Sequence, residues 1–329
     1  MMTKDKKLKI TACIFIAAAV LFGAVVSGAI LLRPYDDGTL TPFNSSANLM
    51  MSGRAAATSA YEFYVLPGDG LYRYTVSDGT SDKIADGDVS CINPADGEIF
   101  YISQGRIIAG DYLGLAKRTL AEEYTVKHMS VNGYWVYFSD ENGSLYKMRR
   151  NGSDLRDISP EGLKVGRFSA DNRRVLFLSD ESLYCIKSDG KFVGKIADNV
   201  GLFNYTSDNL FYSQNGTIEQ IYQYAGEFDT SLYPEYNPIN AEIFNYCFNA
   251  EGNGVIYYMS GDSLCVRTLY VKVYKADDIP EADYTVAEQL PGVTELYKTG
   301  YHLYAYSSSG DVWRITADES YKGTVEKLA

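Results

Sequence analysis

The chain has 329 residues, with 42 Asp and Glu against 30 Lys and Arg, so its formal net charge at pH 7 is −12. This balance disfavours a nucleic-acid-binding protein, because affinity for a phosphate backbone depends on clustered basic side chains. The hydrophobic fraction of 46% and the charged fraction of 22% exclude a disordered acidic tail, and abundant Tyr, Phe and Gly with only 9 Pro favour many short strands joined by tight turns.

The first predicted element is an apolar helix. Residues 1–9 carry four lysines and one acid, and residues 10–32 carry no charge. At about 1.5 Å per residue, a helix of this length crosses the ~30 Å hydrocarbon core of a bilayer. The lysines before the segment place the N-terminus in the cytoplasm. We therefore predict a cytoplasmic tail at 1–9, a transmembrane signal-anchor helix at 10–32, and a single-pass protein of the cell membrane whose C-terminal domain is extracytoplasmic.

Two other interpretations of this segment stay open. A cleaved secretory signal has an apolar region of about 7–15 residues; this one is longer, although residues 27–29 are small enough for a signal peptidase. A lipoprotein signal is suggested by Cys13 after Ile-Thr-Ala, but a lipidated cysteine follows an apolar stretch and Cys13 begins one. Residues 33–47, weakly periodic and containing Thr, Ser, Asn and Gly, are predicted to form a tether.

Repeated aromatic residues dominate the rest of the chain. One or two aromatic residues within a short apolar run recur at intervals of 34 to 47 residues. The marker residues are Phe63, Phe100, Tyr137, Phe177, Phe211, Tyr257 and Tyr304. A second apolar run follows each marker, and turn pairs such as Asp78-Gly79, Asn151-Gly152 and Asp189-Gly190 follow several of these runs. Such pairs supply the positive φ angles that tight hairpins need.

Each repeat is thus predicted to be a meander of four short antiparallel strands. A single sheet of this kind cannot cover both of its faces, but copies stacked around an axis cover one another. We predict an all-β protein with a β-propeller at 48–329, of seven four-stranded blades, with six as the alternative. The innermost strand of the first blade is expected near residues 48–52, and the last outer strand at Thr324 to Leu328.

Two blades resemble a known repeat. Val136 to Asp140, followed by Gly143 to Met148, is similar to the YWTD blade of low-density-lipoprotein-receptor propellers, and Val175 to Asp180 is similar to a second copy. The stretch from about Asn48 resembles the bacterial low-density-lipoprotein-receptor-related-like propeller family of unassigned function. The resemblance implies that Asp140 and Asp180 form structural hydrogen bonds between blades. It carries over no ligand-binding residue.

Residues for catalysis or metal binding are scarce. The two histidines, His128 and His302, are interpreted as packed or rim residues, and no Cys-x-x-Cys pair is present. We predict no catalytic residue, cofactor or metal site. Because the second strand separates Cys247 from Cys265, and Cys91 and Cys185 fall in different blades, we also predict four buried thiols and no disulfide.

The candidate partner-binding residues lie in two segments outside the repeat, 226–239 and 269–278, because long irregular segments of a propeller often carry function. They are Phe228, Tyr233, Tyr236, Tyr270, Tyr274, Asp277 and Asp278. We predict a membrane-anchored binding or scaffolding module for a protein or a cell-wall polymer, and no nucleic acid as partner. The alternative is a glycan hydrolase or lyase with a carboxylate pair at one propeller face.

Overall fold

The computed structural model describes residues 44–206, 209–224, 227–229, 239–248, 254–269 and 283–329. All of them belong to one compact unit that begins at Leu40. Within these residues, no helix has the length and apolar character needed to span a bilayer. The predicted anchor at 10–32 lies outside them.

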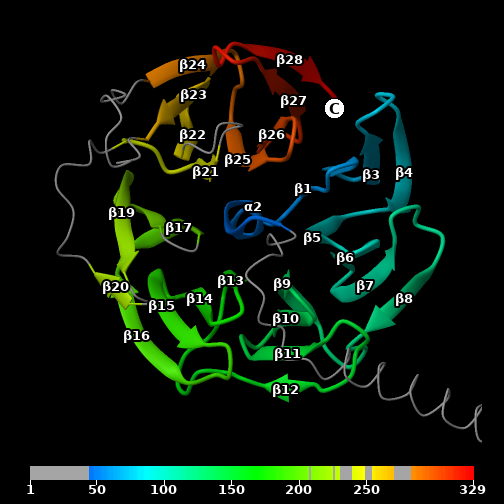
Figure 1. Ribbon diagram of the computed structural model, residues 1–329, viewed down its shortest axis with the longest axis vertical. Coiled ribbons are helices and arrows are strands. Elements are labelled where there is room, and N and C mark those ends of the chain that lie inside the picture. Colours follow the sequence, from blue (N-terminus) through cyan, green and yellow to red (C-terminus); the bar gives the residue numbers. More distant parts are fainter. Residues whose placement is uncertain (1–43, 207–208, 225–226, 230–238, 249–253, 270–282) are drawn as a thin grey trace, which may run out of the picture. The chain divides into compact units, whose positions relative to one another are not determined.

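The described residues form seven antiparallel sheets of four strands each, arranged around a common axis (Figure 1). The predicted all-β propeller is therefore confirmed, with seven blades and not six. The blades, in chain order, are β1 (Ala55–Ala57), β2 (Tyr61–Leu66), β3 (Gly70–Thr75), β4 (Ser81–Asp86); β5 (Val89–Ala95), β6 (Glu98–Ser103), β7 (Arg106–Asp111), β8 (Lys117–Leu120); β9 (Val126–Asn132), β10 (Trp135–Asp140), β11 (Leu145–Arg149), β12 (Arg156–Asp157); β13 (Phe168–Ala170), β14 (Arg174–Ser179), β15 (Ser182–Lys187), β16 (Phe192–Ala197); β17 (Val200–Tyr205), β18 (Asn209–Gln214), β19 (Thr217–Tyr224), β20 (Glu227–Asp229); β21 (Phe244–Phe248), β22 (Gly254–Ser260), β23 (Ser263–Thr268), β24 (Asp283–Ala287); and β25 (Val293–Lys298), β26 (Leu303–Ser307), β27 (Val312–Ala317), β28 (Gly323–Lys327).

The second strand of each blade carries its aromatic marker. All seven markers are buried, because the middle strands of a blade are covered on both faces by neighbouring blades. Each blade consists of four strands that are consecutive in the chain, so the ring closes without exchange of a strand between the first and last blades. The final strand, β28, is the outer strand of blade 7, as expected from the sequence.

The prediction of an inner strand at residues 48–52 is wrong. Ser46–Met50 forms a short helix, α2, and the inner strand of blade 1 begins only at Ala55. The Ser45 hydroxyl accepts a hydrogen bond from the Asn48 N–H and caps this helix. All five residues of α2 are buried at the centre of the ring (Figure 1), where the helix contacts the inner strands β13, β17, β21 and β25. Tertiary contacts therefore decide the conformation of this segment.

The three predicted turn pairs form hairpin ends. Gly79, Gly152 and Gly190 have φ angles of 74°, 88° and 93°, which only glycine adopts without strain. The side chain that precedes each glycine accepts a hydrogen bond from the backbone N–H two residues farther on: Asp78 from Thr80, Asn151 from Ser153, and Asp189 from Lys191. These pairs therefore terminate the third strands of blades 1, 3 and 4.

Asp140 and Asp180 do not link neighbouring blades; near the axis, the links come from the inner strands. The Asp140 carboxylate accepts hydrogen bonds from the N–H groups of residues 142 and 144 in its own hairpin, and Asp180 is exposed in a turn. Inner-strand amides make the connections: Asn93 accepts from the N–H of Val131, Asn204 accepts from that of Tyr246, and Asn245 donates to the carbonyl of Leu296. The role implied by the YWTD resemblance is thus not found.

The four described cysteines are free thiols. Cys91 and Cys185 are buried as predicted, whereas Cys247 and Cys265 are only partly buried, so the prediction of four buried thiols is half wrong. Cys247 lies on β21 and Cys265 on β23, with β22 between them, as the strand spacing predicted.

Candidate functional site

The axis of the ring is filled by the chain itself. The Asn48 side chain, at the centre of α2, donates hydrogen bonds to Asn44, to the carbonyl of Ala55 and to the carbonyl of Lys298, at distances of 2.9 Å, 3.3 Å and 2.9 Å. Its oxygen accepts from the side chain of Asn245 and the N–H of Lys298. Many ligand sites lie in concave cavities, but here the centre of the propeller is occupied by a hydrogen-bonded plug.

A buried carboxylate joins the first and last blades. Glu62 on β2 is fully buried and accepts hydrogen bonds from the Thr299 hydroxyl, the backbone N–H groups of Tyr301 and His302, the His302 ring and the Tyr304 hydroxyl. Burial alone would raise the pKa of Glu62, but the hydrogen bonds from His302 and Thr299 and the charge of His302 outweigh it and lower the pKa to about 2. This network joins blade 1 to blade 7 and so closes the ring of blades. Its carboxylate is buried and cannot act on a substrate.

The other histidine, His128, lies beside a cysteine. The ring nitrogen Nδ1 of His128 is 3.5 Å from Sγ of Cys91, and Nε2 is 2.8 Å from the carbonyl oxygen of Phe168. Burial lowers the pKa of His128 to about 4 and raises that of Cys91 to about 11. Both groups are therefore neutral at pH 7, whereas a nucleophilic cysteine needs a lowered pKa. Both histidines are packed side chains, as the sequence predicted.

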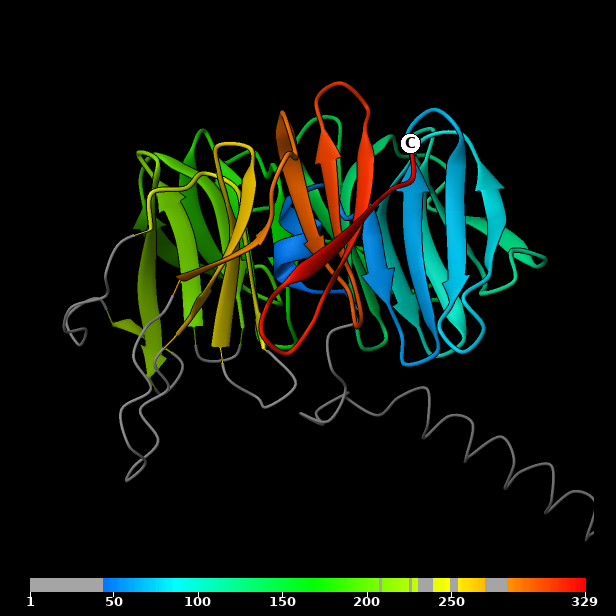
Figure 2. The same ribbon diagram turned by 90° about the horizontal axis from the view of Figure 1, so that it is seen from above.

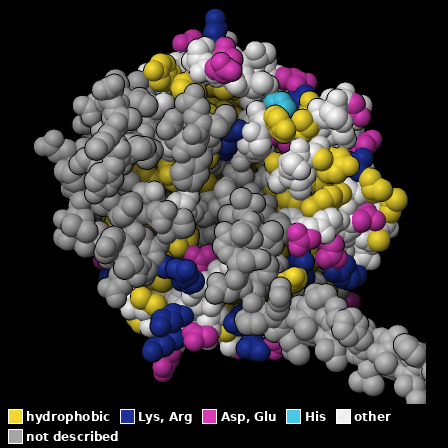
Figure 3. Space-filling model, viewed as in Figure 1, with side chains coloured by type: hydrophobic (Ala, Val, Ile, Leu, Met, Phe, Trp, Pro, Cys, Tyr) yellow, Lys and Arg dark blue, Asp and Glu magenta, His cyan; other side chains and the backbone are white. Residues whose placement is uncertain are grey.

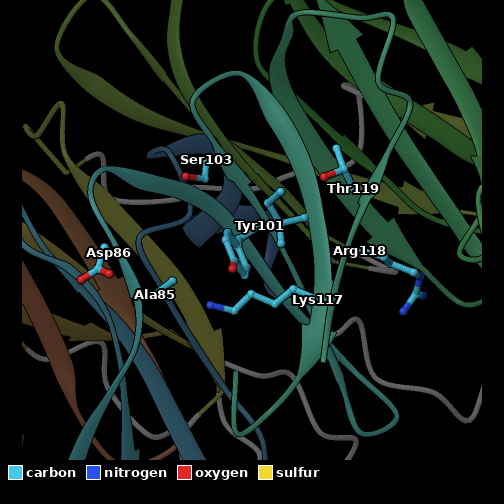
Figure 4. A pocket seen from close by; sticks show the side chains of 8 residues that line it. Ala85, Asp86, Tyr101, Ser103, Lys117, Arg118 and Thr119 are labelled. Carbon is cyan, nitrogen blue, oxygen red and sulfur yellow. The ribbon is translucent and has the colours of Figure 1, made fainter. Parts of the chain in front are cut away.

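A shallow hollow of about 320 Å³ lies on the rim between blades 1 and 2 (Figure 4). Its charged side chains are Asp86 from β4 and Lys117 and Arg118 from β8. The ammonium group of Lys117 donates to the carbonyl of Ile84 at 2.8 Å, and Arg118 pairs with Glu98 at 2.6 Å. Because both cations are engaged within the protein and the hollow is open, it offers little to hold a small ligand.

The loop 112–116, at the end of this hollow, is a rigid apolar projection. The Asp111 carboxylate accepts hydrogen bonds from the N–H groups of Leu113, Leu115 and Ala116. Gly114 lies against blade 1, where an added Cβ would meet the carbonyl oxygen of Ile84 at 2.6 Å. Leu113 and Leu115 are nevertheless 54% and 80% exposed. The fold thus holds two leucine side chains in solvent on a fixed backbone.

We expect Asp111→Ala to loosen this loop without unfolding the propeller. The substitution removes the acceptor for three backbone N–H groups, all at the surface, so cleavage within 112–116 by a protease should become at least about tenfold faster while the melting temperature changes little. Limited proteolysis with mass spectrometry measures both rate and position. Asp82→Ala, which removes only the surface ion pair with Arg73, is the matched control. Equal cleavage rates for the two variants would contradict the capping role of Asp111.

The meander order divides the loops between two faces of the ring. Loops between the first and second or the third and fourth strands of a blade emerge on one face, and all other connections emerge on the opposite face. The first face is called the tether face, because Ser46 and Asn48 near the first described residue bond to Tyr205 and Lys298, the last residues of β17 and β25, which both end there. The opposite face is called the acidic face, and the C-terminus lies on it (Figure 2).

Charge is distributed unevenly between the faces. The described loops of the acidic face contain thirteen acidic residues and three basic ones, Arg54, Lys164 and Arg167. Those of the tether face contain seven acidic and four basic residues. The acids of the acidic face are Asp69, Asp88, Glu122, Glu123, Glu141, Glu161, Asp180, Glu181, Asp198, Glu242, Asp262, Glu288 and Asp311. Three of them, Asp69, Asp198 and Asp311, pair with lysines on adjacent strands, so a large negative excess remains.

Exposed apolar side chains show the opposite distribution. Among the described residues, the large exposed apolar side chains of loops all lie on the tether face, namely Leu113, Leu115, Leu155 and Tyr301. Three more lie within the first two residues of outer strands that begin at that face, and these are Phe192, Val193 and Tyr284. Figure 3, which views the tether face, shows hydrophobic side chains gathered over blades 1 and 2. Among the described loops, one face is therefore strongly acidic and the other exposes large apolar side chains.

Most of the predicted partner-binding residues lie outside the described residues: Tyr233, Tyr236, Tyr270, Tyr274, Asp277 and Asp278. Phe228, on β20, is described only by its backbone, which pairs with that of Gln223 on β19. Their binding role stays a prediction. The structure does redefine the first segment, because residues 227–229 are the outer strand of blade 5 and Ile239 is a buried core residue bonded to Ile218. Residues 226 and 230–238 of this segment lie outside the described residues.

The acidic face and the Asp111-capped loop were missed from the sequence. Their signals were present, in the acids that follow second and fourth strands and in the Asp-x-Leu-Gly-Leu pattern at 111–115. Finding them requires the alternation of the loops between the two faces.

No family model matches the chain, and no curated protein matches it. Among solved structures, the chain is similar to the computationally designed Ika8 protein, with a TM-score of 0.54, 12% identity, and coverage of 80% of this chain and 82% of that chain. It is also similar to Hsv2 of Kluyveromyces lactis, with a TM-score of 0.50, 11% identity, and coverage of 82% and 94%. These likenesses concern the propeller fold alone and add nothing to the YWTD resemblance.

Proposed function

We propose that the protein is a membrane-anchored extracytoplasmic propeller that acts as a binding or scaffolding module for a protein partner with a basic surface. The observation that carries the proposal is the acidic face, whose described loops hold thirteen acids against three bases. A face with such an excess attracts cationic surfaces and speeds their association. It would repel a polyanionic wall polymer, so a protein is favoured over such a polymer.

The filled axis supports a binding role over an enzymatic one. Hydrolysis of a glycan needs two carboxylates about 5–9.5 Å apart in a site open to the sugar. The rim hollow contains one carboxylate, Asp86, and the buried Glu62 is fully engaged by blade 7. Propellers commonly serve as protein-binding scaffolds, and the surface that this one offers consists of loops around a closed centre.

Charge reversal on the acidic face tests the proposal. We expect the full chain carrying Glu122→Lys, Glu123→Lys, Glu141→Lys and Glu161→Lys to capture about tenfold less of its partner from crosslinked membranes, because four exposed acids lose their attraction for basic groups. Quantitative mass spectrometry of the captured proteins measures this. Glu319→Lys, an exposed acid of the tether face, is the control and should capture normally. Unchanged capture by the fourfold variant, or an equal loss in the control, would refute the proposal.

The segment 230–238 is a separate part of the proposal, since it contains Tyr233 and Tyr236. Replacing 230–238 with a Gly-Ser linker, while keeping β20 and the buried Ile239, should leave the melting temperature unchanged and abolish capture of the same partner. A replacement that also removed Ile239 would delete a core side chain and would confuse the two effects. Full capture with the linker in place would limit the binding surface to the blades.

A further inference from the structure

The exposed apolar side chains of the tether face form a surface with no partner within the described chain. Leu113 and Leu115 project from blade 2, Leu155 from blade 3 and Tyr301 from blade 7, and none of the described acidic-face loops exposes a comparable side chain. Scattered exposed apolar residues are ordinary on soluble proteins, but segregation of this kind to one face of a ring indicates a specific contact.

The position of the N-terminal end of the propeller identifies the occupant. Ser46 and Asn48, near the first described residue, bond to strand ends on the tether face. Between the apolar segment 10–32 and Asn44 lie only residues 33–43, which span at most about 40 Å when fully extended. If the segment 10–32 spans a bilayer, the face nearest to that bilayer is the one that carries the leucines.

Charge supports the same orientation. Bacterial and other cellular bilayers often carry anionic lipids, which repel a surface with a large negative excess. The described tether-face loops hold seven acids and four bases, against thirteen acids and three bases on the acidic face. Asp154 of the tether face is also neutralised by its pair with Arg156, which lies on β12 and is not among these four bases. An anionic bilayer therefore repels the tether face less than it repels the acidic face.

The loop 112–116 is built for insertion at low entropic cost. Asp111 fixes its backbone through three N–H groups. The Tyr112 ring packs against Tyr61 and Phe63 with centroid distances of 5.9 Å and 5.4 Å, which ties the loop to blade 1. Two exposed leucines on an ordered loop lose little freedom when they enter an apolar phase. Tyr301, at 53% exposure, is a residue type enriched at the membrane interface.

We propose that the tether face lies on the lipid bilayer, with Leu113 and Leu115 inserted at the boundary between headgroups and acyl chains. This orientation rests on the proposed membrane anchoring, and it directs the acidic face away from the membrane, toward the partner. The propeller is then a platform held flat on the surface at two places, the N-terminal segment and the leucine loop.

Fluorescence quenching in nanodiscs tests the orientation on the full chain. Leu115→Trp places a fluorescent reporter at the proposed contact, and Leu113→Trp places one at the other exposed leucine of the same loop. Glu141→Trp is the matched control on the acidic face. The wild type gives the background fluorescence of the natural Trp135 and Trp313. In nanodiscs whose acyl chains are brominated near the headgroup, we expect the added fluorescence of the two leucine variants to fall by about half and to shift to the blue. The added fluorescence of the Glu141→Trp control should not change.

The outcomes separate this inference from the proposed function. A chain that stays with the nanodisc in gel filtration but shows no quenching at position 115 or 113 overturns the orientation and leaves the anchoring intact. A blue shift without quenching by brominated lipid shows that a protein surface, such as a second copy, covers the loop, and also overturns it. Quenching of equal size in the Glu141→Trp variant also overturns the orientation. A chain that separates from the nanodisc refutes the anchoring, and the orientation with it.

Discussion

Glu62→Gln is expected to destabilise the folded propeller by about 3–5 kcal/mol, because it removes a buried carboxylate that several hydrogen-bond donors share. Five hydrogen bonds from blade 7 converge on the two carboxylate oxygens of Glu62. The amide of glutamine offers one acceptor oxygen, and its NH₂ group would face donors such as the His302 ring and the Tyr304 hydroxyl. Since no strand is exchanged between blades 1 and 7, this network is a principal link that closes the ring.

Denaturant unfolding followed by tryptophan fluorescence measures the effect. Glu98→Gln is the matched control, because Glu98 makes one ion pair with Arg118 at the surface and its loss should cost less than about 1 kcal/mol. A Glu62→Gln variant with a free energy of unfolding within about 1 kcal/mol of the control would show that the network does not stabilise the closure.

The same carboxylate predicts a pH dependence. The pKa of Glu62 is lowered from the usual 4.5 to about 2 in the folded protein. The unfolded chain therefore binds its proton more tightly, and the stability from this group is complete above about pH 5 and is lost as the pH falls toward 2. The difference corresponds to about 3 kcal/mol. Between about pH 5 and pH 2 the wild type should lose more stability than Glu62→Gln; equal slopes would contradict the assignment.

Asn48→Leu is expected to destabilise the protein by about 2–4 kcal/mol, although leucine is close to asparagine in size and more apolar. The substitution leaves the N–H of Lys298 without the acceptor that Asn48 supplies and removes one partner each from the Lys298 carbonyl and the Asn245 side chain. Unsatisfied buried polar groups cost about 1–3 kcal/mol each. Because α2 contacts the inner strands of blades 4 to 7, the loss weakens several blades together.

The melting temperature of the full chain checks this prediction. Asn172→Leu, at an exposed loop position, is the control and should leave the melting temperature within about 1 °C of the wild type. Asn48→Asp should be at least as harmful as Asn48→Leu, since it places a charge beside the buried Asn44 and Ala55 carbonyl groups. A stabilised Asn48→Leu variant would show that α2 acts as an apolar plug and not as a hydrogen-bonded one.

Features set by nearby residues were predictable. The turn glycines Gly79, Gly152 and Gly190 and the buried aromatic markers follow from patterns a few residues long, because a tight turn needs positive φ and a strand covered on both faces needs apolar side chains. The spacing of the markers predicted seven blades with six as the alternative, and the structure has seven. The position of Cys247 and Cys265 on the first and third strands of blade 6 followed from the same spacing.

Other features depend on contacts between distant residues. The segment 48–52 looks like a strand by its apolar content, but hydrogen bonds that Asn48 donates to the Lys298 carbonyl and accepts from the Asn245 side chain, some 200 to 250 residues away, hold most of it as a helix. The inter-blade role expected of Asp140 was wrong because its carboxylate is nearer to the N–H groups of its own hairpin, while amides on the inner strands face the next blade.

The sequence by itself determined the repeated four-stranded unit and the overall negative charge, since these depend on composition and on short-range patterns, and it left six or seven units open until the structure showed seven. Only the tertiary structure decided how the ring closes, what fills its centre and which residues share a face. Glu62 and His302 meet across 240 positions of sequence. The separation of thirteen acids from the exposed leucines appears only when alternate loops are placed on opposite sides of a closed ring.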